Sequence, residues 1–175
     1  MKRLKAAFHT HTCDDPFDVI LHSAEMLIDG VAAKNLSVLA IACHECCVFN
    51  DYLSSYARKR GVVLVPGIEA CLDGRHVVIL NSDAEQAKAS TFAELRALGK
   101  RDAAAIAPHP YYPVGSSVLG ELERNIDLFD AIEYYRFYPK LLNLLPALNP
   151  NWMAQRARKH RPRWWAHPTR TCCRM

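Results

Sequence analysis

Histidines that border apolar segments are the residues in this sequence most suited to chemistry. His9 and His11 come first, spaced i, i+2 directly after a short apolar run. In an extended chain this spacing places both imidazoles on the same side. Two imidazoles held in this way can bind one transition-metal ion, and a nearby carboxylate can bind a second. A single His-x-His pair also occurs on ordinary surface strands, so the interpretation depends on the rest of the chain.

Four further candidates lie at the borders of later apolar runs: His44, Glu69, His76 and His109. His76 begins its run, whereas the other three follow theirs. Imidazoles and carboxylates gathered in one place are costly to bury without an ion. If the runs are adjacent parallel strands, these residues converge and predict a metal site with more than one ion.

Alternating strands and helices must position these candidates. Continuous apolar runs bounded by turn residues predict buried strands over 4–9, 38–42, 62–65, 76–80, 103–107 and 130–134. Amphipathic spacing predicts helices over 23–36, 51–60, 91–98, 117–128 and 141–159. Such alternation is typical of a mostly parallel sheet, whose functional groups lie at the carboxyl ends of its strands.

Local signals refine these elements. Ser23 is the expected N-cap of the first helix, whose apolar side includes Met26. The strand over 62–65 is expected to end at Pro66, and Asp73-Gly74 is a turn signal. His22 and His160 are expected to be solvated helix residues.

The composition fits one folded domain. The chain has 175 residues, half of them apolar, which is enough for a hydrophobic core. No apolar run reaches the ~20 residues that a membrane span needs, and the N-terminal segment lacks the pattern of a signal peptide. Seven cysteines are an odd number, which favours reduced thiols, so we expect a cytoplasmic protein.

The net charge of +4 does not indicate nucleic-acid binding. Four arginines and no acidic residue lie in 160–175, and the rest of the chain is close to neutral. We therefore expect no nucleic-acid partner and no membrane partner.

Four motifs resemble, in order, those of the polymerase and histidinol phosphatase (PHP) superfamily. They are His9-Thr10-His11-Thr12, Ile41-Ala42-Cys43-His44-Glu45, Pro66-Gly67-Ile68-Glu69 and Ala107-Pro108-His109-Pro110. The resemblance extends from Lys5 to Arg161. It implies a distorted (β/α)7 barrel of the PHP type with a metal centre at its C-terminal rim, which hydrolyses phosphate esters.

The resemblance also implies two or three divalent ions, which residue type alone leaves open among Zn, Mn and Fe. The first ion would be held by His9, His11 and Glu69. Glu69 would bridge to a second ion, completed by His76 and His109. Asp15 and His44 would hold a third, with Asp14 as the competitor of Asp15. Cys43 stands where the family usually has Asp or Glu.

The end of the chain departs from the family pattern. The family closes its site with Gly-x-Ser-Asp-x-His, whose Asp and His are ligands, and this sequence has Trp164-Trp165 and a basic, cysteine-rich end instead. A shifted reading frame from Arg163 onward permits Met-Val-Gly and then Ser-Asp-x-His. We therefore interpret 1–162 as the metallo-phosphoesterase domain and 163–175 as a frameshifted tail, with the last strand missing or disrupted. A genuinely divergent tail is the alternative.

The expected function is hydrolysis of a phosphate ester of a small metabolite or nucleotide by a metal-activated water. Arg136 and Lys140 are candidates to meet the phosphate, or else solvated loop charges. One alternative is a catalytically crippled remnant that acts as a binding module. Another is an amidohydrolase-type enzyme acting on C–N bonds, which usually needs a strand-end lysine that this sequence does not have.

Overall fold

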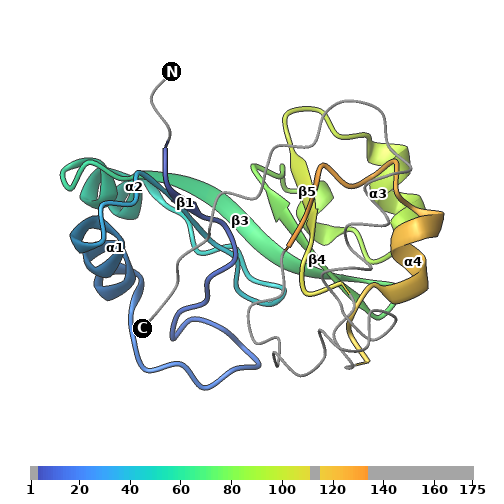
Figure 1. Cartoon of the computed structure of the whole chain (residues 1–175), viewed down its shortest axis with the longest axis horizontal. Coiled ribbons are helices and arrows are strands. Elements are labelled where there is room, and N and C mark those ends of the chain that lie inside the picture. Colours follow the sequence, from blue (N-terminus) through green and yellow to red (C-terminus); the bar gives the residue numbers. More distant parts are fainter. Residues whose placement is uncertain (1–3, 111–114, 134–175) are drawn as a thin grey trace, which may run out of the picture.

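A single curled sheet organises the computed structural model, which describes residues 4–110 and 115–133. Its strands lie in chain order: β1 (Ala6–Ala7), β2 (Val38–Ile41), β3 (Val63–Leu72), β4 (Arg75–Leu80), β5 (Ala104–Ala107) and β6 (Ala131–Ile132). The helices are α1 (Ala24–Ala33), α2 (Asp51–Arg58), the 3-10 turn η1 (Gln86–Lys88), α3 (Phe92–Leu98) and α4 (Leu119–Arg124). Figure 1 shows α1 and α2 at one end of the sheet and α3 and α4 at the other. The described residues form a partial α/β barrel with six strands, and the (β/α)7 arrangement stays an expectation.

The sheet is mixed, which corrects part of the expectation of a mostly parallel one. Strand β4 runs antiparallel to both β3 and β5, while the β1–β2, β2–β3 and β5–β6 pairs are parallel. The cause is the turn at Asp73-Gly74, where both residues have positive φ, 49° and 74°. A two-residue turn of this kind joins antiparallel neighbours only. Consequently β4 begins at the rim where the parallel strands end, and His76 lies at that rim.

Strand β3 is longer than predicted and does not end at Pro66. Its first half pairs with β2 as far as Pro66, and its second half, from Gly67 to Leu72, pairs with β4. The proline has no N–H, but its carbonyl accepts a hydrogen bond from the Asn81 backbone at 2.8 Å. Glu69 therefore lies within a strand rather than in a loop after one.

Gly67 permits the close approach of β3 to β2. A Cβ at this position would lie 3.0 Å from the carbonyl oxygen of Ile41 and 3.3 Å from the Cβ of Ala40. We expect Gly67→Ala to lower the free energy of unfolding by about 1–3 kcal/mol in urea denaturation, because two backbone segments must separate. Gly30→Ala is the matched control: nothing lies within 4 Å of that position in α1, and alanine favours the helix by up to about 1 kcal/mol. Equal stability of Gly67→Ala and wild type would contradict the crowding.

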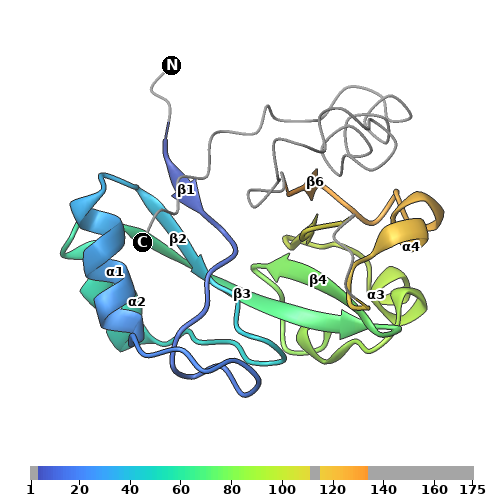
Figure 2. The ribbon, with the colours of Figure 1, turned by 60° about the horizontal axis from the view of Figure 1, so that its bottom comes forward.

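Two apolar clusters cover the outer face of the sheet and a third fills its inner face. Helices α1 and α2 pack on β1, β2 and the start of β3, whereas α3, α4 and Phe129 pack on the end of β3, β4 and β5. The third cluster includes Ala40, Val78 and Leu80. Figure 2 shows β1 and β2 beside one half of the long strand β3 and β4 beside its other half. Side chains alternate between the two faces, so Glu69 faces inward between the outward Ile68 and Ala70.

Other elements differ from the predicted bounds. β1 is two residues long instead of six, and α4 ends at Arg124 because the Asn125 side chain donates to the Glu121 carbonyl at 3.1 Å. Ser23 does cap α1, but Met26 is 62% exposed rather than on the apolar side. The predicted helix 141–159, the tail 163–175, Arg136, Lys140 and His160 lie outside the described residues. None of the helices in the described part is long and apolar enough to cross a membrane.

Candidate metal centre

Five imidazoles surround the carboxylate of Glu69, whose side chain is 1% exposed. Each places one ring nitrogen between 3.0 and 3.3 Å from a Glu69 oxygen. Three approach Oε2 and two approach Oε1; in that order they are His9, His11, His44, His76 and His109. The structure therefore brings together, at one rim of the curled sheet, side chains from five segments of the chain.

Pairing of the strands places two of these imidazoles. Beyond the end of β2, the Glu69 N–H donates to the Cys43 carbonyl at 3.0 Å, and this bridge puts His44 beside Glu69. In the β3–β4 hairpin, Cys71 is opposite His76 and Glu69 is opposite Val78. His76 is thus the diagonal neighbour of Glu69 on the same face, within reach of a long side chain.

Thr10 fixes the segment that carries His9 and His11. Its hydroxyl donates to the Ala40 carbonyl at 2.7 Å, and its own carbonyl accepts from the Ala42 N–H at 2.7 Å. These contacts extend the alignment of β1 with β2 past the end of the strand. Both flanking imidazoles consequently turn to Glu69, as the i, i+2 spacing predicts.

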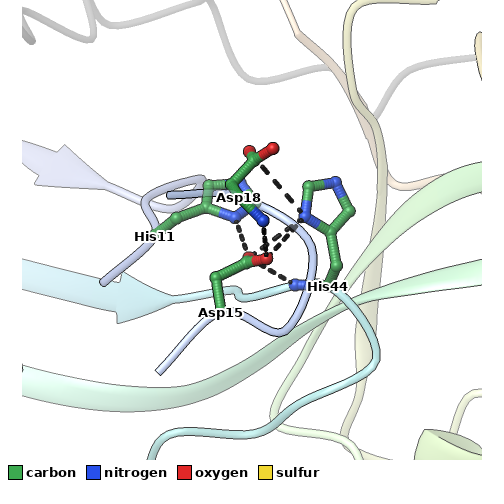
Figure 3. Close-up of side chains that lie close together, drawn as sticks. All are labelled: His11, Asp15, Asp18 and His44. Carbon is green, nitrogen blue, oxygen red and sulfur yellow. Dashed lines mark hydrogen bonds and ion pairs between the residues drawn. The ribbon is translucent and has the colours of Figure 1, made fainter. Parts of the chain in front are cut away.

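Asp15 is a second buried carboxylate, and it contacts two of the imidazoles (Figure 3). Its Oδ2 lies 2.7 Å from His11 Nδ1 and 3.0 Å from His44 Nδ1, and it accepts from the His44 backbone N–H at 2.9 Å. Its Oδ1 accepts from the backbone N–H groups of Phe17 and Asp18, each at 2.9 Å. Burial alone would raise the pKa of Asp15, but these hydrogen bonds outweigh burial and hold its pKa below the ordinary value. Asp14, in contrast, is exposed and accepts from the Thr12 hydroxyl.

The sequence reasoning missed two carboxylates of this region. Asp18, whose side chain is 58% exposed, has its Oδ2 4.0 Å from His44 Nδ1 (Figure 3). Glu133 Oε2 lies 3.1 Å from His9 Nδ1 and accepts from the His109 backbone N–H at 2.9 Å. The position of Glu133 at the carboxyl end of a predicted strand was a usable signal. Asp18 lies in a loop, and no pattern in the sequence marks it. His22, expected to be a solvated helix residue, precedes α1, and its Nε2–H donates to the His11 carbonyl at 2.9 Å.

Contacts between carboxylates and imidazoles lower the pKa of the carboxylate Glu69 and raise the pKa values of the imidazoles His9 and His11. Burial of Glu69 alone would raise its pKa, but contacts with His109, His11 and the other imidazoles hold that pKa far below the ordinary value. Burial of His9 alone would lower its pKa, but the contacts with Glu133 and Glu69 raise it from 6.5 to about 10. The pKa of His11 is also raised, because Glu69 and Asp15 outweigh its burial.

The donor set fits divalent cations better than protons. Two carboxylate oxygens offer about four lone pairs, fewer than the five ring nitrogens that face Glu69. Protonating every ring would place positive charges in rings whose neighbouring centroids are 4.7–5.9 Å apart. In addition, Nδ1 of His109 is buried without a hydrogen-bond partner. Imidazole and carboxylate together suit Zn, Mn or Fe.

Three groups of donors, each with ligand atoms within 4.8 Å of one another, occur among the described residues. They are His9–Glu69–His109, His44–Glu69–His76 and His11–Asp15–Asp18–His44. This grouping differs from the predicted division of ligands, which joined His9 to His11 and His76 to His109. His44 belongs to two groups. Because a neutral imidazole has one lone pair, His44 can serve one of these groups at a time.

These pKa shifts predict the stability of the metal-free protein. Because folding lowers the pKa of Glu69, this group stabilises the fold at pH values above 4.5, its ordinary pKa. The stabilisation is lost as the pH falls below 4.5. Because folding raises the pKa of His9, this group contributes its full stabilisation at pH values below 6.5. That stabilisation is lost as the pH rises to about 10. We therefore expect Tm in EDTA to be highest between pH 4.5 and 6.5 and to fall on both sides. A Tm that rises steadily from pH 6.5 to about 10 would contradict this coupling.

The comparison with known structures concerns the fold. The chain is similar to the crystal structure of a two-domain protein from Bacteroides vulgatus containing a predicted PHP-like metal-dependent phosphoesterase. The two are 19% identical with a TM-score of 0.56, and the match covers 74% of this chain and 43% of the other. This chain thus spans less than half the length of that protein. Neither a protein-family model nor a curated protein matches the sequence.

Proposed function

We propose that this protein is a metal-dependent phosphoesterase of the PHP type that acts on a small phosphorylated substrate. The observation that carries the proposal is the buried Glu69 carboxylate with five imidazole nitrogens within 3.3 Å. The similarity of the fold to a protein with a PHP-like domain supports it. The residue types at the centre and the fold both favour this class of reaction.

The proposed ligands of two or three divalent ions are His9, His11, Asp15, His44, Glu69, His76 and His109. Glu69 belongs to two of the donor groups, His9–Glu69–His109 and His44–Glu69–His76, so it is suited to bridge two ions. Asp15 and His44 would hold a third ion, and Asp18 is the further carboxylate on that side. When bound, such ions supply a water of lowered pKa and a positive clamp for phosphate oxygens.

The side chains of this protein perform the positioning that this chemistry needs. The two oxygens of Asp15 hold the loop that carries Phe17 and Asp18 against His11 and His44. Phe17 is 70% exposed, and its ring is nearly perpendicular to that of His44, with the two centroids 5.9 Å apart. It therefore forms an apolar wall beside the imidazoles and limits access of water from that side.

Reconstitution with single metals tests the proposal. The EDTA-treated protein is to be loaded in turn with Zn²⁺, Mn²⁺ or Fe²⁺ and assayed with p-nitrophenyl phosphate and with a dihydropyrimidine amide. Phosphate release that depends on the metal supports the phosphoesterase. Hydrolysis of the amide alone would favour the amidohydrolase-type alternative. Tight metal binding without either activity would favour the binding module.

The C-terminal proposals need the coding DNA and a second protein. We propose that 1–162 is the catalytic domain and that 163–175 is frameshifted, and Arg136 and Lys140 remain candidates for phosphate contact. If the codons around Pro162 cannot encode Ser-Asp-x-His in another reading frame, the proposed frameshift is wrong. A chain with that motif restored is expected to hydrolyse phosphate esters faster than the chain with the present sequence. Location in the cytoplasm likewise remains a proposal.

A further inference from the structure

Glu133 contacts the metal centre without belonging to any of its three donor groups. It follows β6, and its own backbone N–H donates to the Ala107 carbonyl at 2.9 Å. Because Ile132 packs in the outer cluster, alternation turns Glu133 to the inner face. One oxygen, Oε2, then meets both His9 Nδ1 at 3.1 Å and the His109 N–H at 2.9 Å.

These two contacts connect opposite edges of the sheet. His9 follows β1, one edge strand, while Glu133 follows β6, the other. Three strand ends, those of β1, β5 and β6, are therefore held by one carboxylate at the rim. The contact with His109 also supports an unfavourable backbone, since φ of His109 is 29°, on the left-handed side that residues with a side chain rarely adopt.

The chemistry of His9 follows from its two partners. A neutral imidazole has one N–H and one lone pair. When a cation replaces the second ring proton, the carboxylate of Glu133 at Nδ1 is placed to accept the remaining N–H, which leaves the lone pair on Nε2, 3.0 Å from Glu69. A carboxylate behind a ligating histidine fixes its tautomer and raises its basicity.

We propose that Glu133 is a positioning residue that sets the tautomer of His9 and the place of His109, and thereby raises the affinity of the His9–Glu69–His109 group for a divalent cation. The inference rests on the proposed function only in that this group binds a cation. Hydrolysis of a phosphate ester is not required for it.

Titration of the metal-free full chain with Co²⁺ tests this role. Affinity is measured by competition with a chelator, and the visible absorption bands of Co²⁺ report the geometry at the ion. We expect Glu133→Ala to weaken the tightest site about 10- to 100-fold and to change its bands. Glu133→Gln keeps an oxygen that can accept both N–H groups but loses the charge, so a smaller loss is expected. Glu45→Gln is the control, since its carboxylate accepts from the Cys71 backbone rather than from an imidazole.

Each outcome decides the inference. Weaker binding and shifted bands in a Glu133→Gln protein whose metal-free form keeps the wild-type circular dichroism spectrum separate positioning from mere structural support. The Tm of that metal-free variant is expected to fall near neutral pH, because Glu133 helps to raise the pKa of His9. If Glu133→Ala fails to fold, the glutamine variant alone carries the test. Wild-type affinity and bands in the glutamine variant and in a folded alanine variant would overturn the proposal. Wild-type protein that binds Co²⁺ but hydrolyses no phosphate ester would sink the proposed function and leave this inference standing, whereas no binding by wild type would overturn both.

Discussion

Replacing Glu69 with glutamine is expected to abolish tight metal binding and all metal-dependent hydrolysis. The substitution keeps the size of the side chain but removes the negative charge that faces five imidazoles. Breaking a buried charged contact of this kind costs about 3–5 kcal/mol, which corresponds to at least about 100-fold in affinity. Metal content by mass spectrometry and affinity by chelator competition measure the loss.

The same variant has a second, independent effect on the metal-free protein. Glu69 is among the groups that raise the pKa values of His9 and His11, so both values are expected to fall in Glu69→Gln. Titration of the histidine ring protons by NMR checks this. Exposed Glu45→Gln should leave metal content and histidine titration unchanged. A Glu69→Gln protein that still binds its full complement of metal would refute the central place of this carboxylate.

Replacing Asp15 with alanine is expected to have the second largest effect. Its side chain is fully buried and accepts from three backbone N–H groups, besides its contacts with two imidazoles. Leaving buried donors unpaired costs about 1–3 kcal/mol for each, and partial access of water relieves some of this, so we expect a loss of about 2–4 kcal/mol. Urea denaturation of the metal-free protein measures it. Loaded protein is also expected to hold one ion fewer, as the proposed third position requires.

Asp14→Ala is the matched control for Asp15→Ala. The two residues are adjacent, and the sequence left them as competitors for one ligand position. Asp14 is exposed and contacts only the Thr12 hydroxyl among the described side chains. Its loss is expected to change stability by no more than about 0.5 kcal/mol and metal content not at all. Equal effects of the two substitutions would show that the loop is not organised by Asp15.

The fold accounts for the convergence that both predictions probe. Strand β3 pairs first with β2 and then with β4, and Glu69 lies on the inner face of β3. The two strands that neighbour β3 therefore each place an imidazole beside Glu69: His44 follows the end of β2, and His76 lies near the start of β4. His9, which follows the edge strand β1, also reaches the same carboxylate. Figure 2 shows the curl of the sheet that brings this edge toward β3.

The sequence alone determined the strand–helix alternation and the candidates at the strand borders. Continuous apolar runs gave six strands in the right order, and Ser23 and Thr91 cap helices that begin where the spacing predicts. Residues such as His9, His44 and His109 were predictable because the chemistry of a strand end is local. A polar side chain that directly follows an apolar run can be recognised from that run alone.

Only the tertiary structure decided how these residues combine. The antiparallel direction of β4, the continuation of β3 through Pro66 and the grouping of His9 with His109 depend on pairing between distant segments. Glu133 contacts His9 across 124 positions of sequence, and Asp15 is chosen over Asp14 by backbone N–H groups that only the folded loop presents. Such contacts are set by the curl of the sheet and by the direction in which each side chain leaves the backbone. Neither quantity is encoded in a short stretch of residues.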